Sequence, residues 1–236
     1  MTADVSLELP ASRPRDAPLS LEVPGHGTVS ARLRVPSAAR LAYVLAHGAG
    51  AGMEHPLLRT VADELAARHV ATLRFQFPYR ERGARRIDPP AVCHATVRAA
   101  VAATASALPG LPLFAGGRSF GGRMSSQAQA LEPLPGVRGL AFLGFPLHPA
   151  GQPGAARAAH LEQVQIPMLF IQGERDALAR PAWLVPVVQR LGSRATLSWV
   201  PQADHGFHAP ARGGRADSEL RAVWLTTLVA WMEGLR

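Results

Sequence analysis

A lone serine lies within a glycine-rich turn of the kind that presents a nucleophile. The stretch LFAGGRSFGGRM (113–124) sets an apolar run against this turn, and GRSFG (117–121) fits the pattern Gly-x-Ser-x-Gly. In a tight turn from strand to helix, glycines two residues on either side remove the side chains that would collide, so the hydroxyl stands clear of the backbone. A helix N-terminus also favours a developing negative charge. The pattern predicts that Ser119 is a nucleophile.

A serine hydroxyl needs a base, and the base needs a group that orients it. Asp176 comes shortly after the apolar run PMLFIQG (167–173), and His205 comes shortly after ATLSWV (195–200). In this interpretation His205 takes the proton from Ser119 and returns it to the leaving group, while Asp176 holds the imidazole in the required tautomer. The sequence therefore predicts a catalytic triad of Ser119, Asp176 and His205.

Three nearby residues are alternatives for these roles. Asp204 is adjacent to His205 and would need an awkward backbone turn to reach its ring, and Glu174 lies a step before the apex of its loop. Asp176 is therefore favoured over both. His208 is the alternative base, although a position in a pocket or on the surface is favoured for it.

A tetrahedral intermediate also needs donors for its oxyanion. The stretch HGAG (47–50) follows the apolar run 41–46, as a loop of this type does in esterases. The backbone N–H of Ala49, or of neighbouring Gly50, is predicted to converge with that of Phe120. We expect the ring of His47 to pack under this loop rather than to transfer protons.

The elements that would position these residues alternate between strand and helix. LSLEVPGHGTVSARLRV (19–35) predicts an antiparallel hairpin. Apolar runs then predict buried parallel strands at 41–46, 70–75, 111–116, 139–145, 167–173 and 195–200. Segments between and after these runs predict helices at 55–69, 89–108 and 217–236, the last beginning with an Asp or Ser cap. This alternation predicts a mostly parallel sheet covered by helices on both faces, with the active site at the carboxyl ends of its strands.

Composition limits the remaining possibilities. A chain of 236 residues that is 47% hydrophobic favours one domain, at 18–236, after a loose leader at 1–17. The formal charge of +8 comes from arginine without lysine. The densest group of arginines has no nucleic-acid-binding motif around it, so we expect a solvated loop and no nucleic acid partner; the group comprises Arg80, Arg82, Arg85 and Arg86. No export signal or membrane span is visible, and one cysteine, Cys93, cannot form an internal disulfide. We expect a cytoplasmic protein.

The motifs together resemble the α/β-hydrolase superfamily, in its dienelactone-hydrolase-like part. The order Ser, Asp, His along the chain is that of this superfamily. Five stretches resemble, more narrowly, the group that contains the NSL-complex regulatory subunit three, testis-expressed protein thirty and many bacterial hydrolases: HGAGAGMEHP, RFQFPYRERGARR, GGRSFGGRM, GFPLHP and ADHGF. The resemblance implies a sheet of seven or eight strands with little or no cap, and hydrolysis of a carboxylic ester through an acyl-enzyme on Ser119.

One departure concerns the nucleophile. Dienelactone hydrolases carry a cysteine at this turn, whereas the single cysteine here, Cys93, falls in a predicted helix. Dienelactone itself is therefore not the expected substrate. The same residues would serve a thioesterase, peptidase or perhydrolase, and a non-catalytic interaction module is the alternative outside enzymes.

The region around the triad gives some indication of the substrate. The segment between the apolar runs at 139–145 and 167–173 is too short for a helical cap domain, which predicts an open pocket for a small acyl ester. Residues at predicted strand ends or loops are candidates to line it: Tyr79, Arg80, Phe120, Phe145, His148 and Phe207. Arg118 could bind a substrate carboxylate or clamp neighbouring loops. No cofactor or metal motif is present. The apolar last helix leaves a monomer or a homodimer open.

Overall fold

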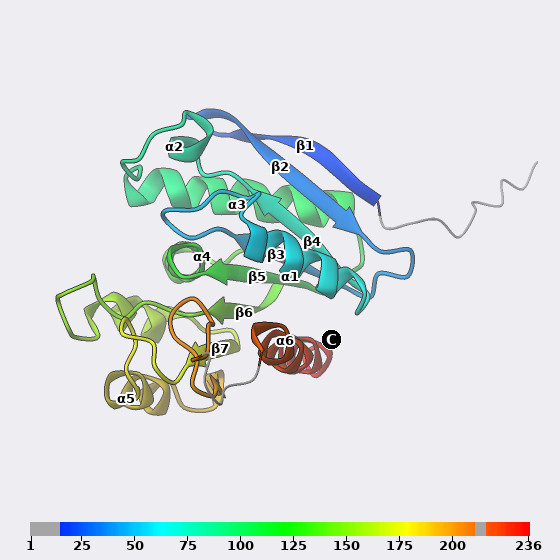
Figure 1. The fold of residues 1–236 in the computed structure, drawn as a ribbon. Helices are drawn as coiled ribbons and strands as arrows, with labels where there is room; N and C mark the ends of the chain where they lie inside the picture. The colour runs from blue at the N-terminus through cyan, green and yellow to red at the C-terminus, as the bar shows by residue number, and fades with distance from the viewer. Residues whose placement is uncertain (1–14, 211–215) are drawn as a thin grey trace, which may run out of the picture.

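Eight strands form one sheet in the computed structural model, which describes residues 15–210 and 216–236 (Figure 1). The strands are β1 (Arg15–Val23), β2 (Gly27–Val35), β3 (Leu41–Ala46), β4 (Val70–Phe75), β5 (Leu113–Arg118), β6 (Val137–Leu143), β7 (Met168–Gly173) and β8 (Ala195–Val200). Their order in the sheet is β1-β2-β4-β3-β5-β6-β7-β8. All pairs from β4 to β8 are parallel, so the carboxyl ends of these strands meet at one edge.

The first two strands form the predicted antiparallel hairpin. Leu19 pairs with Ala31, and β2 pairs antiparallel with β4, which joins the hairpin to the parallel part of the sheet. The expected leader at 1–17 lies mostly outside the described residues. Its last three residues belong to β1, which begins at Arg15.

Helices cover both faces of the sheet, as the alternation of elements predicts. The helices are α1 (Pro56–Ala66), α2 (Pro78–Glu81), α3 (Pro90–Ala107), α4 (Phe120–Leu131), α5 (Pro181–Leu191) and α6 (Asp217–Glu233), with short 3₁₀ helices η1 (Ala156–Gln163) and η2 (Gly192–Arg194). Apolar residues of α1 and α6 pack on one face, and those of α3, α4 and α5 pack on the other (Figure 1). Trp224 and Leu228 of α6 are buried in this packing.

Two strand boundaries differ from the predicted ones because of glycine. The fifth strand continues to Arg118 instead of ending at 116. Gly116 and Gly117, with φ of 148° and 140°, allow it to continue between β3 and β6. A Cβ at Gly116 would lie 1.9 Å from the carbonyl oxygen of Ala141, so the strand admits no side chain there. The sixth strand ends at Leu143 instead of 145, since Gly144 turns the chain with φ of 73°.

The prediction that α6 begins with an Asp or Ser cap is wrong. The capping position is Ala216, and no side chain caps the helix. Asp217 is the first helical residue, and its carboxylate instead accepts hydrogen bonds from the preceding loop, from His208 Nδ1 at 2.5 Å and from the backbone N–H of Ala209 at 3.2 Å. The carboxylate therefore ties the helix to that loop.

The segment between β6 and β7 forms a small cover rather than a cap domain. Its 3₁₀ helix η1 packs on α4, and His160 Nε2 lies 2.7 Å from Ser126 Oγ. Within the described residues, no helix combines the length and the apolar character that crossing a bilayer requires.

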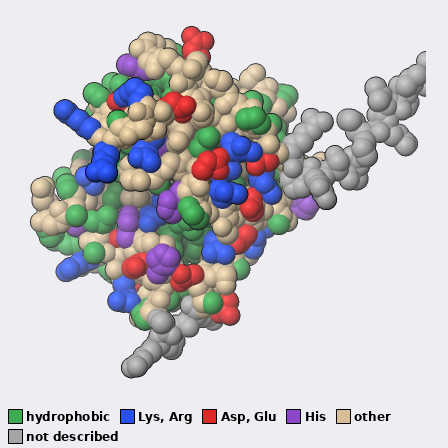
Figure 2. Space-filling view, turned by 45° about the horizontal axis from the view of Figure 1, so that its top comes forward, with side chains coloured by type: hydrophobic (Ala, Val, Ile, Leu, Met, Phe, Trp, Pro, Cys, Tyr) green, Lys and Arg blue, Asp and Glu red, His purple; other side chains and the backbone are tan. Residues whose placement is uncertain are grey.

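Three of the four arginines expected in a solvated loop are exposed there. Arg82, Arg85 and Arg86 lie in the loop after α2, where Arg82 donates to Asp88 Oδ1 at 2.5 Å. Arg80 instead lies on α2 and is partly buried. Figure 2 shows arginine side chains in several groups on the displayed face, with carboxylates between some of them.

Candidate active site

Ser119 occupies the predicted sharp turn, between the end of β5 and the start of α4. Its backbone has φ of 50° and ψ of −112°, a conformation that costs a residue with a side chain about 1–3 kcal/mol. The strain persists because the backbone around it is held: Ser119 N–H donates to the carbonyl of Leu143 at 3.1 Å. The glycines of the motif are required for close packing as well. A Cβ at Gly121 would lie 2.6 Å from the backbone of Ala46 and His47.

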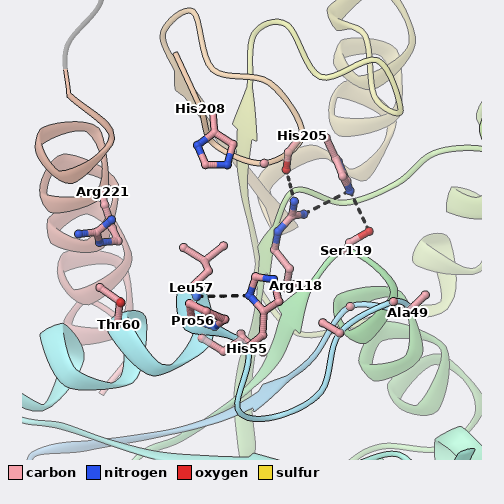
Figure 3. A pocket seen from close by; sticks show the side chains of 15 residues that line it. Ala49, His55, Pro56, Leu57, Thr60, Arg118, Ser119, His205, His208 and Arg221 are labelled. Carbon is pink, nitrogen blue, oxygen red and sulfur yellow. Dashed lines mark hydrogen bonds between the residues drawn. The ribbon is translucent and has the colours of Figure 1, made fainter. Parts of the chain in front are cut away.

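A hydrogen-bonded line joins the three residues of the predicted triad (Figure 3). The Oγ of Ser119 lies 3.0 Å from His205 Nε2, and His205 Nδ1 lies 2.6 Å from Asp176 Oδ2. They come from the turn after β5, the loop after β8 and the loop after β7, which all lie at the carboxyl edge of the sheet. Parallel strands thus bring together residues that are far apart in the sequence.

Asp176 is fully buried, and its carboxylate is satisfied by hydrogen bonds. Besides His205, it accepts from the backbone N–H of Leu178 at 2.8 Å and from Gln172 Nε2. Gln172 in turn accepts from the backbone N–H of Phe145 at 2.9 Å. The carboxylate oxygens of Asp176 thus accept from all of their neighbours, and Oδ2 orients the ring with an N–H at His205 Nδ1. The Nε2 nitrogen is then left as an acceptor for the serine proton.

Gln172 is a residue that the sequence interpretation missed. It is fully buried in β7, at the last position but one of the motif PMLFIQG. The signal available in the sequence was a polar side chain near the end of an otherwise apolar strand.

The alternative residues serve other contacts. Asp204 Oδ1 accepts from the backbone N–H groups of Gly206 at 2.7 Å and His208 at 3.0 Å, which shapes the loop that carries His205. Glu174 accepts from the backbone N–H of Gln202 at 3.0 Å. The hydrogen bond from His208 to Asp217 raises the pKa of this exposed histidine. None of these three side chains takes part in the line from Ser119 to Asp176.

The loop at 47–50 lies beside Ser119. A Cβ at Gly48 would be 4.0 Å from the Cβ of Ser119, an ordinary van der Waals contact, which places this loop directly against the turn of the nucleophile. Within the described residues, no intramolecular hydrogen bond uses the backbone N–H of Ala49, Gly50 or Phe120. These N–H groups are the predicted oxyanion donors, and they remain available to a ligand.

His47 and Tyr79 hold this loop through hydrogen bonds to its backbone carbonyls. His47 is fully buried, with Nδ1 donating to the carbonyl of Gly48 at 2.8 Å and Nε2 accepting from the backbone N–H of Phe77 at 3.1 Å. Burial lowers the pKa of His47 to about 4, so the ring is neutral. The hydroxyl of Tyr79 donates to the carbonyl of Ala49 at 2.7 Å. The packing role expected for His47 is therefore confirmed.

Most of the residues expected to line the substrate pocket are in the core. Tyr79 and Phe145 are fully buried, and Phe145 packs against Phe142, Phe170 and His160. His148 and Phe207 are at most 5% exposed. Arg80 is partly buried on α2, and neither Arg80 nor Phe120 is among the cavity-lining residues. The prediction that these residues line the substrate pocket is therefore corrected. The reason for the aromatic ones is that a side chain near a strand end can point into the core instead of into the pocket.

Arg118 lines the cavity, but its guanidinium acts as a clamp. Nη1 donates to the carbonyl of Leu143 at 3.1 Å and lies 3.3 Å from His205 Nε2, while Nη2 donates to the carbonyl of His205. The group also stacks over Phe207, with Cζ 5.4 Å from the ring centroid. Burial lowers the pKa of Arg118 to about 10, which leaves it charged at neutral pH. The guanidinium thus fixes the loop of His205 to the end of β6.

A cavity of about 620 Å³ opens beside the hydroxyl of Ser119. It is bordered by the 48–51 loop, the start of α1, the His205 loop and α6. Its lining comprises Gly48, Ala49, Gly50, Ala51, His55, Pro56, Leu57, Leu58, Thr60, Arg118, Ser119, His205, Gly206, His208 and Arg221. Throughout residues 15–210 and 216–236, no group of three His, Cys, Asp or Glu side chains is placed to hold a metal ion.

A mostly parallel eight-stranded sheet that carries this turn and this hydrogen-bonded line defines the class as that of α/β hydrolases. The chain belongs to the family described as the alpha/beta hydrolase domain, which it matches over residues 39–233.

Solved structures of several hydrolases have the same fold. An α/β serine hydrolase without lid from Xanthomonas campestris is 22% identical, with a TM-score of 0.73, and the match covers 94% of this chain and 98% of that one. A dienelactone hydrolase from Anabaena variabilis is 21% identical, with a TM-score of 0.74 and coverage of 93% and 99%. The esterase domain of a Rhodothermus marinus protein is 18% identical, with a TM-score of 0.67 and coverage of 92% and 97%. The narrower resemblance to the group of the NSL-complex regulatory subunit three stays a prediction.

Proposed function

We propose that the protein is a serine hydrolase that cleaves carboxylic esters through an acyl-enzyme on Ser119. The observation that carries this proposal is the continuous hydrogen-bonded line from Asp176 through His205 to Ser119. Its order along the chain and its place at the carboxyl edge of the sheet support the same conclusion. A purely structural role would not require a strained serine next to a histidine and a buried carboxylate.

The proposed reaction has two half-reactions. Ser119 Oγ attacks the ester carbonyl while its proton passes to His205 Nε2, and the buried carboxylate of Asp176 offsets the charge of the imidazolium. His205 then returns the proton to the leaving alcohol as the C–O bond breaks, which leaves the acyl group on Oγ. In the second half-reaction His205 takes a proton from water, the hydroxide adds to the acyl carbon, and Ser119 Oγ leaves with that proton.

The oxyanion of each tetrahedral intermediate would be stabilised by backbone donors. The unengaged N–H of Ala49 or Gly50, together with that of Phe120, forms the proposed oxyanion hole. Removing one such donor in other enzymes lowers the rate by about 10²–10³-fold. Tyr79 and His47 contribute indirectly, because their hydrogen bonds to the carbonyls of Ala49 and Gly48 hold the loop.

Small acyl esters are the proposed substrates, since the cavity beside Ser119 is open and has no cap domain over it. One solved relative is called a dienelactone hydrolase and others are called esterases, which supports an ester or lactone as the bond cleaved. We further propose that the protein acts in the cytoplasm as a monomer or homodimer, without a nucleic acid partner.

Hydrolysis of 4-nitrophenyl acetate and butyrate tests this proposal. We expect Ser119→Ala to lower the rate by at least about 10³-fold, the scale of loss when a triad member is removed. The matched control is Ser193→Ala, at an exposed serine in η2, which should hydrolyse both esters as the native protein does. Intact mass spectrometry should show an acyl adduct on the native protein and none on Ser119→Ala. Equal rates for Ser119→Ala and the native protein would overturn the proposal.

A further inference from the structure

The cavity beside Ser119 extends away from the nucleophile to a wall made by two helices. Figure 3 shows Ser119 and His205 on one side, and Thr60 of α1 and Arg221 of α6 on the other. A volume of about 620 Å³ is within the range of roughly 300–1,000 Å³ that is typical of small-molecule sites. The space therefore accommodates more than an acetyl group, and its far end can contribute to specificity.

The lining of this cavity is basic. It contains two arginines and three histidines and, within the described part of the chain, no carboxylate: the basic residues are His55, Arg118, His205, His208 and Arg221. Four carboxylates contact these residues without lining the cavity. They are Asp176 on His205, Asp204 on the backbone of His208, Asp217 on the ring of His208 and Glu64 on Arg221. Since none of these carboxylates lines the cavity, a ligand would meet arginine side chains there and no carboxylate, which favours an anionic ligand.

Arg221 is the lining cation best placed to bind such a ligand. Its Nε donates to Glu64 Oε1 at 2.7 Å, which orients the guanidinium, and its side chain is 19% exposed. Across the described residues, no hydrogen bond engages its two Nη nitrogens. A guanidinium has five N–H donors in a planar fork, so four of them remain for a ligand. Arg118 differs, because two backbone carbonyls already occupy its fork.

Apolar side chains also line part of the cavity between the basic residues. Pro56 and Leu57 at the start of α1 line it, together with the small side chains of Ala49 and Ala51. A complementary ligand would have a short hydrocarbon chain that passes these residues and ends in an anion. The acyl part of an ester is the part that such a walled cavity would hold, because it stays bound through both half-reactions while the alcohol leaves.

We propose that the preferred substrates are esters whose acyl chain ends in a carboxylate, which Arg221 binds at the far wall of the cavity. This inference rests on the esterase activity proposed above. The carboxylate would accept a two-point hydrogen bond from the fork of Arg221, a geometry that arginine favours. Arg221 is therefore a specificity-determining residue, and it takes no part in bond cleavage.

The test compares two esters that differ only in the terminal group of the acyl chain, a carboxylate in one and a neutral amide in the other. They are 4-nitrophenyl 5-carboxypentanoate and its neutral analogue 4-nitrophenyl 5-carbamoylpentanoate, which have the same length and nearly the same shape. Release of 4-nitrophenolate is measured, with the rate of Ser119→Ala subtracted. We expect the native protein to prefer the carboxylate in kcat/KM. Arg221→Gln should lower the ratio of the two kcat/KM values about tenfold, which corresponds to about 1.4 kcal/mol, with the effect mainly in KM.

Two further variants separate binding from support of the fold. Glu64→Gln breaks the ion pair between α1 and α6 but keeps the guanidinium, so the preference for the carboxylate should be retained or increased. Arg190→Gln, on the exposed surface of α5, removes the same charge away from the cavity and should leave the ratio within about twofold. Thermal unfolding of each variant checks that it is folded.

The inference is overturned if the native protein hydrolyses both esters equally well and Arg221→Gln leaves their ratio unchanged. It is also overturned if Glu64→Gln lowers the ratio as much as Arg221→Gln, because the ion pair and not the cation would then be responsible. Either result, obtained with Ser119-dependent hydrolysis of the neutral ester, leaves the proposed esterase function intact. If Ser119→Ala hydrolyses both esters at the native rate, the proposed function itself fails.

Discussion

Gln172 connects the fold to the candidate active site, and its replacement by methionine should damage both. The amide accepts from the backbone N–H of Phe145 and donates to Asp176 Oδ2, and all three groups are buried. Methionine has a similar length but offers no comparable donor or acceptor. Gln172→Met therefore leaves an N–H group unpaired and removes one charge-assisted hydrogen bond from a buried carboxylate.

The expected loss of stability follows from these two contacts. A buried donor left unpaired costs about 1–3 kcal/mol, and a hydrogen bond to a charged group contributes about 1.5–3 kcal/mol. Asp176 keeps its bonds to His205 and to the N–H of Leu178, so the second contribution belongs at its lower end. We expect the free energy of unfolding to fall by about 3–4 kcal/mol, a large part of the roughly 5–15 kcal/mol that holds a typical domain folded.

Urea unfolding measures this loss, and ester hydrolysis measures its effect on the site. Because Asp176 would be less firmly held, we expect kcat/KM to fall about tenfold under conditions where the variant is folded. The control is Gln165→Met, at an exposed glutamine whose amide makes contacts of 3.3 and 3.4 Å to backbone carbonyls. A loss of stability below about 1 kcal/mol for Gln172→Met, or a loss equal to that of the control, would refute the reasoning.

Two other perturbations test the packing of the sheet and the tie between the His205 loop and α6. Gly116→Ala should lower the free energy of unfolding in urea by more than about 4 kcal/mol, because the new Cβ would lie 1.9 Å from the carbonyl oxygen of Ala141. The control is Gly110→Ala, at a glycine that also has a positive φ but has open space around it, which should cost about 1–2 kcal/mol. Equal losses of stability for the two variants would show that backbone strain, and not the contact with Ala141, determines the cost. The pair of His208 and Asp217 should stabilise the fold by less than about 1 kcal/mol, since both are exposed. The folded state raises the pKa of His208 above its ordinary value of about 6.5, so this contribution should be present at pH 6 and lost by pH 9 as the histidine deprotonates. Urea unfolding of the native protein and His208→Ala at the two pH values measures it, and a difference that grows with pH would contradict the assignment.

Much of the fold could be predicted because buried parallel strands leave a direct signal. The apolar runs at 41–46 and 70–75 coincide with β3 and β4, since a strand covered on both faces needs apolar residues throughout. The run at 195–200 coincides with β8, which lies at the edge of the sheet and is only partly buried. The meeting of Ser119, Asp176 and His205 followed from the same rule, because parallel strands bring their carboxyl ends to one edge.

The remaining features depend on directions and pairings that spacing does not encode. Tyr79 and Phe145 follow strand ends, as pocket residues do, but their rings turn into the core. The contact between Arg221 and Glu64 joins residues that are 157 positions apart. A local pattern cannot indicate such a pair, and it also cannot say which carbonyls a buried guanidinium will reach.

The clamp made by Arg118 has a consequence for the motions of the site. One planar group holds the backbone at the end of β6 and the backbone carbonyl of His205. A displacement of either segment should therefore carry the other with it. The separation between the hydroxyl and the imidazole should then fluctuate less than the position of either loop relative to solvent. Correlated movement of this kind would keep Ser119 Oγ within hydrogen-bonding distance of His205 Nε2 while the surrounding surface adapts to different ligands.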